Sequence, residues 1–241
     1  MLSISGAVSA VRLSLSEVEV TTRKAALGAG FPLGLAEEAG ASAAWLAAAG
    51  FPFDSVMIAA LLADSSKRPR LIRSGNILEL AGEGVGPAIE ILPSACDLVI
   101  ASASAGQQTS VAARVDVPAL AIAQAALAAA ASAVPLAIEI GSKLSAIAGE
   151  NSIALFRTID ELAALRCDRV GIRLATKDDA LTQPAANAAE LAIARGLAFE
   201  KGVVAEDSCW QEISSLAART LVPATTRSRE HGAGAGLIDS D

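Results

Sequence analysis

Residues 111–140, VAARVDVPALAIAQAALAAAASAVPLAIEI, predict the fold class of this chain. The apolar and β-branched run at 111–117 is typical of a strand, and Pro118 suits the first turn of a helix that ends near residue 133. Residues 136–140 are expected to be extended again, with further strands at 153–156 and 169–174. This alternation favours an α/β protein with a mixed sheet and flanking helices, and a mixed α+β arrangement with antiparallel strands stays open.

The N-terminal part predicts helices. Ser14-Leu15-Ser16-Glu17 is a capping box, in which the Ser14 hydroxyl accepts from the Glu17 backbone and the Glu17 carboxylate reaches back. Two more helices are expected at 34–49 and at 55–63, the latter capped by Asp54. We therefore expect residues 1–65 to form a helical unit that packs on an α/β domain at 66–241, as two units or as one continuous domain.

Short apolar runs follow this helical unit. Residues 71–72, 77–80, 88–92 and 97–102 are separated by Gly, Pro and Ser, a pattern typical of strands. We therefore expect four short strands between the helical unit and residue 111.

Composition narrows the classes of function. Apolar residues make up 53% of the chain and alanine dominates them, which predicts a globular fold with small side chains at its contacts and a tendency to form a homodimer. A net charge of −7 and aromatic residues at only 3% disfavour a nucleic-acid partner, which needs cations for phosphates and rings for bases. The chain is acidic and alanine-rich, and we expect no nucleic acid among its ligands.

Cysteine usage and hydropathy indicate location. Cys96, Cys167 and Cys209 are widely separated and lack C-x-x-C spacing, so a reducing cytoplasm is the simplest compartment. The apolar stretch 118–140 contains Gln124, Ser132, Pro135 and Glu139, and it divides into a helix and a strand. We therefore expect no membrane span and no membrane partner.

Two glycine-rich runs, 82–87 and 232–236, have G-x-G-x-G spacing. A dinucleotide fingerprint requires a strand, G-x-G-x-x-G and then a helix that starts at the phosphates. Pro87 follows the first run directly, and too few residues follow Gly236 for a helix. With a single histidine and no cysteine motif, the sequence predicts neither a cofactor nor a metal site.

The sharpest catalytic candidates are Cys209 and His231. Cys209 is expected in the first turn of the last helix, where the helix N-terminus stabilises a thiolate. His231 is the only histidine and hence the only imidazole available as a base. The alternative for Cys209 is an inert, buried residue beside Trp210.

The C-terminal tail is the predicted ligand site. Three glycines within five residues are costly to order, and hydroxyl and guanidinium groups precede them, which favours contact with an anion. The residues expected to contribute are Thr225, Thr226, Arg227, Ser228, Arg229, Gly232, Gly234 and Gly236.

Both ends of the chain resemble an uncharacterised bacterial family, the domain of unknown function three-seven-two-six. The resemblance implies no activity, substrate or catalytic residue, and its middle part is similar only in pattern. It rests on 14–19, 24–30, 34–40 and 45–46 near the start, and on 219–220, 222–225, Ser228 and 232–237 at the end, while Leu221 departs from the aromatic residue expected there.

Two hypotheses of function stay open. The first is a cytoplasmic small-molecule enzyme or binder that acts on a polar, anionic metabolite, with the tail closing over the ligand. The second is a non-catalytic assembly protein whose tail docks into a partner subunit. Deletion of residues 223–241 leaves the oligomeric state intact under the first hypothesis and changes it under the second.

Overall fold

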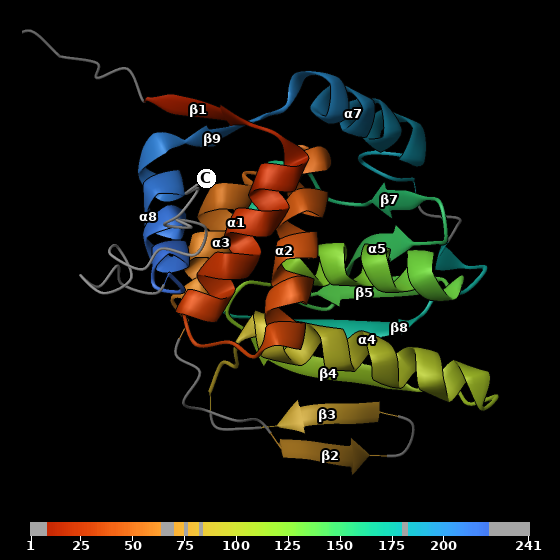
Figure 1. Cartoon of the computed structure of the whole chain (residues 1–241). Helices are drawn as coiled ribbons and strands as arrows, with labels where there is room; N and C mark the ends of the chain where they lie inside the picture. The colour runs from red at the N-terminus through yellow and green to blue at the C-terminus, as the bar shows by residue number, and fades with distance from the viewer. Residues whose placement is uncertain (1–8, 64–69, 75–76, 82–83, 180–182, 222–241) are drawn as a thin grey trace, which may run out of the picture.

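A computed structural model describes residues 9–63, 70–74, 77–81, 84–179 and 183–221. It confirms the predicted mixed α/β class, because a mixed sheet is flanked by helices (Figure 1). The described helices are α1 (Leu15–Gly28), α2 (Leu33–Ala48), α3 (Phe53–Leu61), α4 (Ala88–Ser104), α5 (Leu120–Ser132), α6 (Ile159–Ala164), α7 (Ala188–Lys201) and α8 (Asp207–Ala218). None of these helices is long and apolar enough to cross a membrane.

The described strands form two sheets. They are β1 (Ala10–Leu13), β2 (Arg70–Ser74), β3 (Ile77–Ala81), β4 (Ser110–Val115), β5 (Leu136–Ile140), β6 (Lys143–Ala148), β7 (Ile153–Leu155), β8 (Asp168–Leu174) and β9 (Val203–Glu206). Seven of them form a sheet in the order β2-β3-β4-β8-β5-β6-β7, in which only β3 and β4 are parallel. β1 and β9 pair antiparallel in a separate two-stranded ribbon.

Local signals explain the first helices. The capping box at Ser14 is present as predicted, with the Glu17 N–H bonded to Ser14 Oγ and the Ser14 N–H bonded to the Glu17 carboxylate. α1 packs against both α2 and α8, so a helix from the end of the chain lies beside the N-terminal helices (Figure 1). The division of the chain near residue 65 stays a prediction.

The predicted cap of α3 is wrong by two residues. The helix starts at Phe53, and Asp54 lies inside its first turn, where its side chain is buried. One carboxylate oxygen of Asp54 accepts from the Ser55 N–H, and the other accepts from the Glu206 N–H at 2.6 Å. Asp54 therefore ties α3 to β9, a partner that sequence spacing does not reveal.

The two strands predicted at 88–92 and 97–102 are wrong, because both segments belong to α4. Ile89, Leu92, Cys96 and Val99 follow at helical spacing and are all buried. Pro93 lies within the helix and removes one backbone hydrogen bond, at a cost of about 3 kcal/mol. Burial of four apolar side chains, each worth about 1.5–3 kcal/mol, outweighs that cost.

Candidate functional site

The best-defined polar site lies where β4 ends and α4 begins. Gly86 pairs with the end of β4, because its N–H donates to the Arg114 carbonyl and its own carbonyl accepts from the Asp116 N–H. α4 has Pro87 as its N-cap residue, and Pro87 offers no side-chain hydrogen bond. Asp116 caps the helix instead, since its Oδ1 accepts from the Ala88 N–H at 2.8 Å and from the Val117 N–H at 2.7 Å.

The second oxygen of Asp116 is left without a partner. Oδ2 is buried and has no hydrogen-bond donor among the described residues. Burial raises the pKa of Asp116, while the two backbone N–H bonds and the positive charge of Arg166 oppose that rise. A buried carboxylate oxygen without a donor costs free energy, so Asp116 is a group prepared to accept a hydrogen bond or a proton.

A cavity of about 540 Å³ opens beside this carboxylate. Its walls come from the end of α3, the segment 84–87, the end of β4 and the loop between α6 and β8. The volume lies within the range of small-molecule sites. The polar side chains that line it are Asp116, Arg166 and Cys167.

Arg166 supplies the positive charge of the cavity. Its Nη1 donates to the backbone carbonyls of Ala163 and Leu165, which fixes the side chain. Its Nε and Nη2 have no acceptor within the described ranges, so two donors are available for a ligand. A guanidinium held in this way suits a carboxylate.

Cys167 has an unusual backbone at the mouth of the cavity. Its φ is 55°, a left-handed conformation that side chains other than glycine rarely adopt. The Cys167 N–H donates to the Asp116 carbonyl at 2.8 Å, and the Cys167 carbonyl accepts from Arg114 Nε at 3.2 Å. The surrounding structure therefore holds a strained residue with an exposed thiol, a feature that gathers at functional sites.

The predicted catalytic pair is not assembled by the described residues. Cys209 lies in the first turn of α8 and is partly buried, but its pKa is raised by burial and by the carboxylates of Asp54, Glu206 and Glu212. This shift is opposite to the lowered pKa expected from the helix N-terminus alone. His231 lies outside the described residues, so its pairing with Cys209 stays a prediction.

The predicted ligand site in the tail also lies outside the described residues, which end at 221. It remains a prediction for all of its members, Thr225, Thr226, Arg227, Ser228, Arg229, Gly232, Gly234 and Gly236.

Sequence reasoning missed Asp116, Arg166 and Cys167. The sequence feature nearest to this site is the glycine-rich run before Pro87. It does not fit a dinucleotide fingerprint, because the sequence predicts a strand and no helix after Pro87. A helix does follow, and β3, α4 and the parallel strand β4 form one crossover unit. The Asp116 carboxylate already accepts from Ala88, the first N–H of α4, and places a negative charge there, so this helix start does not favour a phosphate.

Comparison with known proteins finds one family similarity in the N-terminal part. Residues 13–72 match the model of the family Protein of unknown function (DUF3726). The match confirms the predicted resemblance over this segment. Curated proteins give no detectable sequence match.

Solved structures share the fold at low sequence identity. A malate dehydrogenase from Entamoeba histolytica has a TM-score of 0.56 at 9% identity, covering 90% of this chain and 100% of that one. A dehydrogenase from Sinorhizobium meliloti has a TM-score of 0.55 at 15% identity, covering 87% and 100%. Malate dehydrogenase from Pyrococcus horikoshii OT3 has a TM-score of 0.53 at 10% identity, covering 92% and 99%. At these identities the likeness shows the fold alone.

Proposed function

We propose that the chain is a cytoplasmic small-molecule enzyme or binder whose ligand is a small carboxylic acid with a neighbouring hydroxyl or amino group. The observation that carries this proposal is a cavity lined by both Asp116 and Arg166, beside which Asp116 Oδ2 is buried without a hydrogen-bond donor among the described residues. The ligand carboxylate binds Arg166, and the hydroxyl or amino group donates to Asp116. The carboxyl group of Asp116, with its raised pKa, is then suited to accept the proton in base-assisted chemistry.

Two further observations support this class of ligand. Several solved structures with the same fold are named as malate dehydrogenases, and malate is a 2-hydroxy acid, so hydroxy and keto acids are the first compounds to test. The three cysteines are all free, which suits a reducing cytoplasm. The hydroxyl and guanidinium groups of the tail, residues 225–229, offer additional donors for the same anion.

A thermal-shift screen tests the proposal. The full chain is heated with 2-hydroxy acids, keto acids, amino acids, sugar phosphates and nucleotides. A ligand at a hundred times its dissociation constant stabilises the fold by about 2.7 kcal/mol, or about 5–10 °C for a chain of this size. We expect a shift with hydroxy or amino acids.

Variants locate the site. Arg166→Ala removes a charged hydrogen-bond donor and weakens binding about 10- to 100-fold, whereas Lys177→Ala removes an exposed cation outside the cavity and leaves binding unchanged. If Arg227→Ala also loses binding, the C-terminal tail belongs to the binding site. A ligand that binds Arg166→Ala and Asp116→Asn as tightly as it binds the wild type contradicts the proposal.

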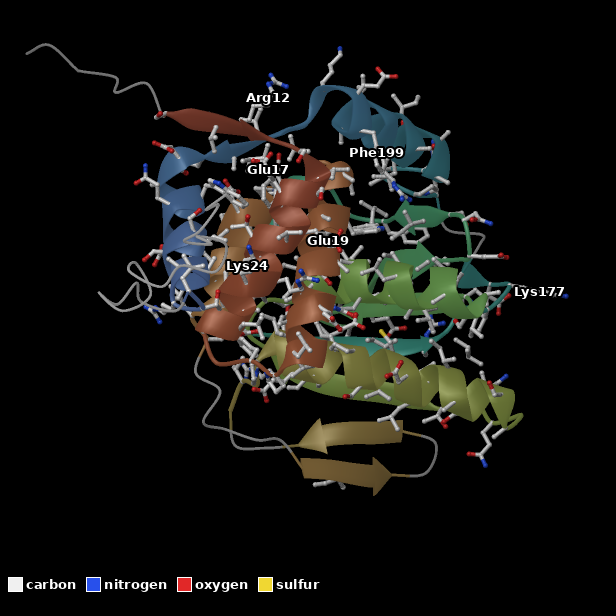
Figure 2. The ribbon with its side chains drawn as sticks, in the orientation of Figure 1. Arg12, Glu17, Glu19, Lys24, Lys177 and Phe199 are labelled. Atoms are coloured by element: carbon white, nitrogen blue, oxygen red, sulfur yellow. The ribbon has the colours of Figure 1, made fainter. Side chains whose placement is uncertain are left out.

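A second candidate function, assembly with another copy of the chain, is favoured by α7. Ile193, Leu197 and Phe199 on α7 are 65%, 47% and 73% exposed, and Val204 on the adjoining β9 is 57% exposed. Figure 2 shows Phe199 on α7 at the same end of the molecule as Arg12 of β1. Ile193 and Leu197 lie on one side of α7, whereas Phe199 lies on its opposite flank, and an exposed apolar pair at helical spacing is typical of an interface.

The charges of α7 suit a two-fold pair. Glu190, Ile193, Leu197 and Lys201 follow at steps of three, four and four residues and therefore share one side of the helix. In an isologous pair the two helices run antiparallel, so Glu190 of each copy lies opposite Lys201 of the other, with the apolar side chains between them. We therefore propose a homodimer through α7.

Light scattering after size-exclusion chromatography tests the homodimer. We expect a dimer for the full chain, a monomer for Ile193→Glu, and a dimer for Leu33→Glu, which alters an equally exposed residue at the first position of α2. A monomeric full chain excludes the homodimer. A dimer that is lost on deletion of residues 223–241, but kept in Ile193→Glu, assigns the interface to the tail.

A further inference from the structure

The wall of the Asp116 cavity divides into a polar part and an apolar part. The polar side chains come from the end of β4 and from the loop between α6 and β8. The lining residues that the structure describes at the end of α3 and in the segment 84–87 carry no polar side-chain atom. They are Ala59, Ala63, Gly84, Val85, Gly86 and Pro87. A ligand held by the polar part therefore has an apolar surface beside it.

The packing of α3 explains the apolar part of the wall. Met57 and Ala60 of α3 are fully buried in the core, whereas Ala59, in the last turn of the helix, stays partly exposed and lines the cavity. Ala63 follows one helical turn later and lines it too. Val85 is also partly exposed. The small side chains of the alanines leave room for a substituent of the ligand against this surface.

The charges of the cavity suit a ligand with one carboxylate. Arg166 is the one cationic side chain among the described residues that line the cavity, and its Nε and Nη2 can bind a single carboxylate. A second carboxylate on the ligand would lie near the acid Asp116, or it would lose its water against the apolar wall. A methyl group in the same place gains free energy from burial.

We propose that the acid bound in this cavity is a monocarboxylic acid with a short apolar side chain, and that a dicarboxylic acid of the same length is rejected. This inference rests on the proposed function and selects among its ligands. The carboxylate of the acid binds Arg166, its hydroxyl or amino group donates to Asp116, and its side chain lies against Ala59 and Val85. The cavity therefore favours 2-hydroxybutyrate over malate, which has a second carboxylate in place of the methyl group.

Isothermal calorimetry of the full chain with a series of acids tests this inference. Glycolate, lactate and 2-hydroxybutyrate share the carboxylate and the hydroxyl, and each is longer than the last by one carbon. We expect the affinity to rise about fourfold with each carbon, which corresponds to about 0.8 kcal/mol per buried methylene. We expect malate to bind at least about tenfold more weakly than 2-hydroxybutyrate. Glycine, alanine, 2-aminobutyrate and aspartate form the same series for an amino acid ligand.

Two variants of the apolar wall make the test specific. Val85→Lys places a cation there, so malate should bind more tightly than 2-hydroxybutyrate in this variant. Leu33→Lys is the control, because it adds the same charge at an exposed residue outside the cavity and should leave the preference unchanged. Ala59→Leu fills the space for the side chain and should weaken 2-hydroxybutyrate about tenfold. Glycolate, which has no side chain, should still bind Ala59→Leu, and its binding shows that the variant is folded.

The outcomes separate this inference from the proposed function. If malate binds the wild type as tightly as 2-hydroxybutyrate, and Arg166→Ala loses both, the inference is overturned and the proposed function stands. Equal affinities for glycolate, lactate and 2-hydroxybutyrate overturn it in the same way, because the apolar wall then makes no contact with the ligand. A preference for malate in both Val85→Lys and Leu33→Lys also overturns it, since the added charge then acts without regard to position. If no hydroxy or amino acid binds at all, the proposed function itself fails.

Discussion

Removal of the Asp179 carboxylate should destabilise the fold more than any other single carboxylate change in its loop. Asp179 is buried, and its two oxygens bind Arg173 Nη1 and Nη2 at 2.7 Å each. Oδ2 also accepts from the N–H and the hydroxyl of Thr176, at 2.7 and 2.9 Å. A metal-binding role for this acid would need oxygens that Arg173 already occupies.

The magnitude follows from these four hydrogen bonds. Each bond to a charged group contributes about 1.5–3 kcal/mol, but the Arg173 side chain is 28% exposed and keeps its bond to Glu139, so water replaces part of the loss. We expect Asp179→Ala to lower the free energy of unfolding by about 3 kcal/mol. For a chain of this size, that corresponds to a decrease in melting temperature of about 6–12 °C.

The pH dependence gives the decisive test. The hydrogen bonds from Arg173, the largest cause, hold the pKa of Asp179 well below its ordinary value despite its burial. A lowered pKa in the folded state stabilises the protein at pH values above the unfolded pKa of about 3.9, and this contribution is lost as the pH falls below it. The difference in the free energy of unfolding between wild type and Asp179→Ala should therefore be largest at neutral pH and decrease below about pH 4.

Urea denaturation at neutral and at acidic pH measures this difference in the free energy of unfolding at each pH, with Asp178→Ala as the control. Asp178 is the exposed neighbour, and its removal should change stability by no more than about 0.5 kcal/mol. The reasoning is refuted if Asp179→Ala and Asp178→Ala are equally stable at neutral pH. It is also refuted if the gap between Asp179→Ala and the wild type is the same at about pH 3 as at about pH 7.

Three other predictions concern the site and the packing. Because the pKa of Asp116 is raised in the fold, stability should decrease as the pH rises above about 4, and Asp116→Asn should lack that slope in denaturation at several pH values. Cys167, which is exposed, should react with a thiol reagent in the native protein, whereas Cys96 should react only after unfolding. Gly28→Ala should destabilise strongly in thermal unfolding, because its Cβ would overlap the backbone oxygen of Leu216 in α8, whereas Gly34→Ala, with open space, should stabilise by up to about 1 kcal/mol.

Local signals in the sequence predicted helix starts well. The predicted capping box at Ser14 is present with its reciprocal hydrogen bonds, because all of its atoms lie within four consecutive residues. Thr158 starts α6 with a capping box of the same kind. The period of α4 was also present in the sequence, but Pro93 in its interior suggested two strands instead of one helix. Packing against the core stabilises one continuous helix across Pro93, and the sequence pattern of Gly, Pro and Ser does not reveal that packing.

Long-range pairing could not be predicted in the same way. β1 and β9 pair Ala10 with Glu206 across nearly the whole chain, and neither strand has enough residues to stand out in the sequence. The candidate site also depends on contacts between segments that are far apart in the sequence. Asp116 reaches the start of α4 only because Gly86 pairs beside Val115, and Arg166 reaches the cavity from a loop that follows α6. No spacing rule relates these residues.

The buried acidic side chains of this protein nevertheless differ in whether both of their oxygens accept hydrogen bonds. Both oxygens of Asp54 and Asp179 accept hydrogen bonds within the fold, so these side chains hold elements together. Asp116 has one buried oxygen without a donor among the described residues, and its pKa is raised. A fold selected for stability alone would have paired or removed this group. Its persistence beside a cavity is the physical reason to look for a ligand there, an acid that carries a donor group for Asp116.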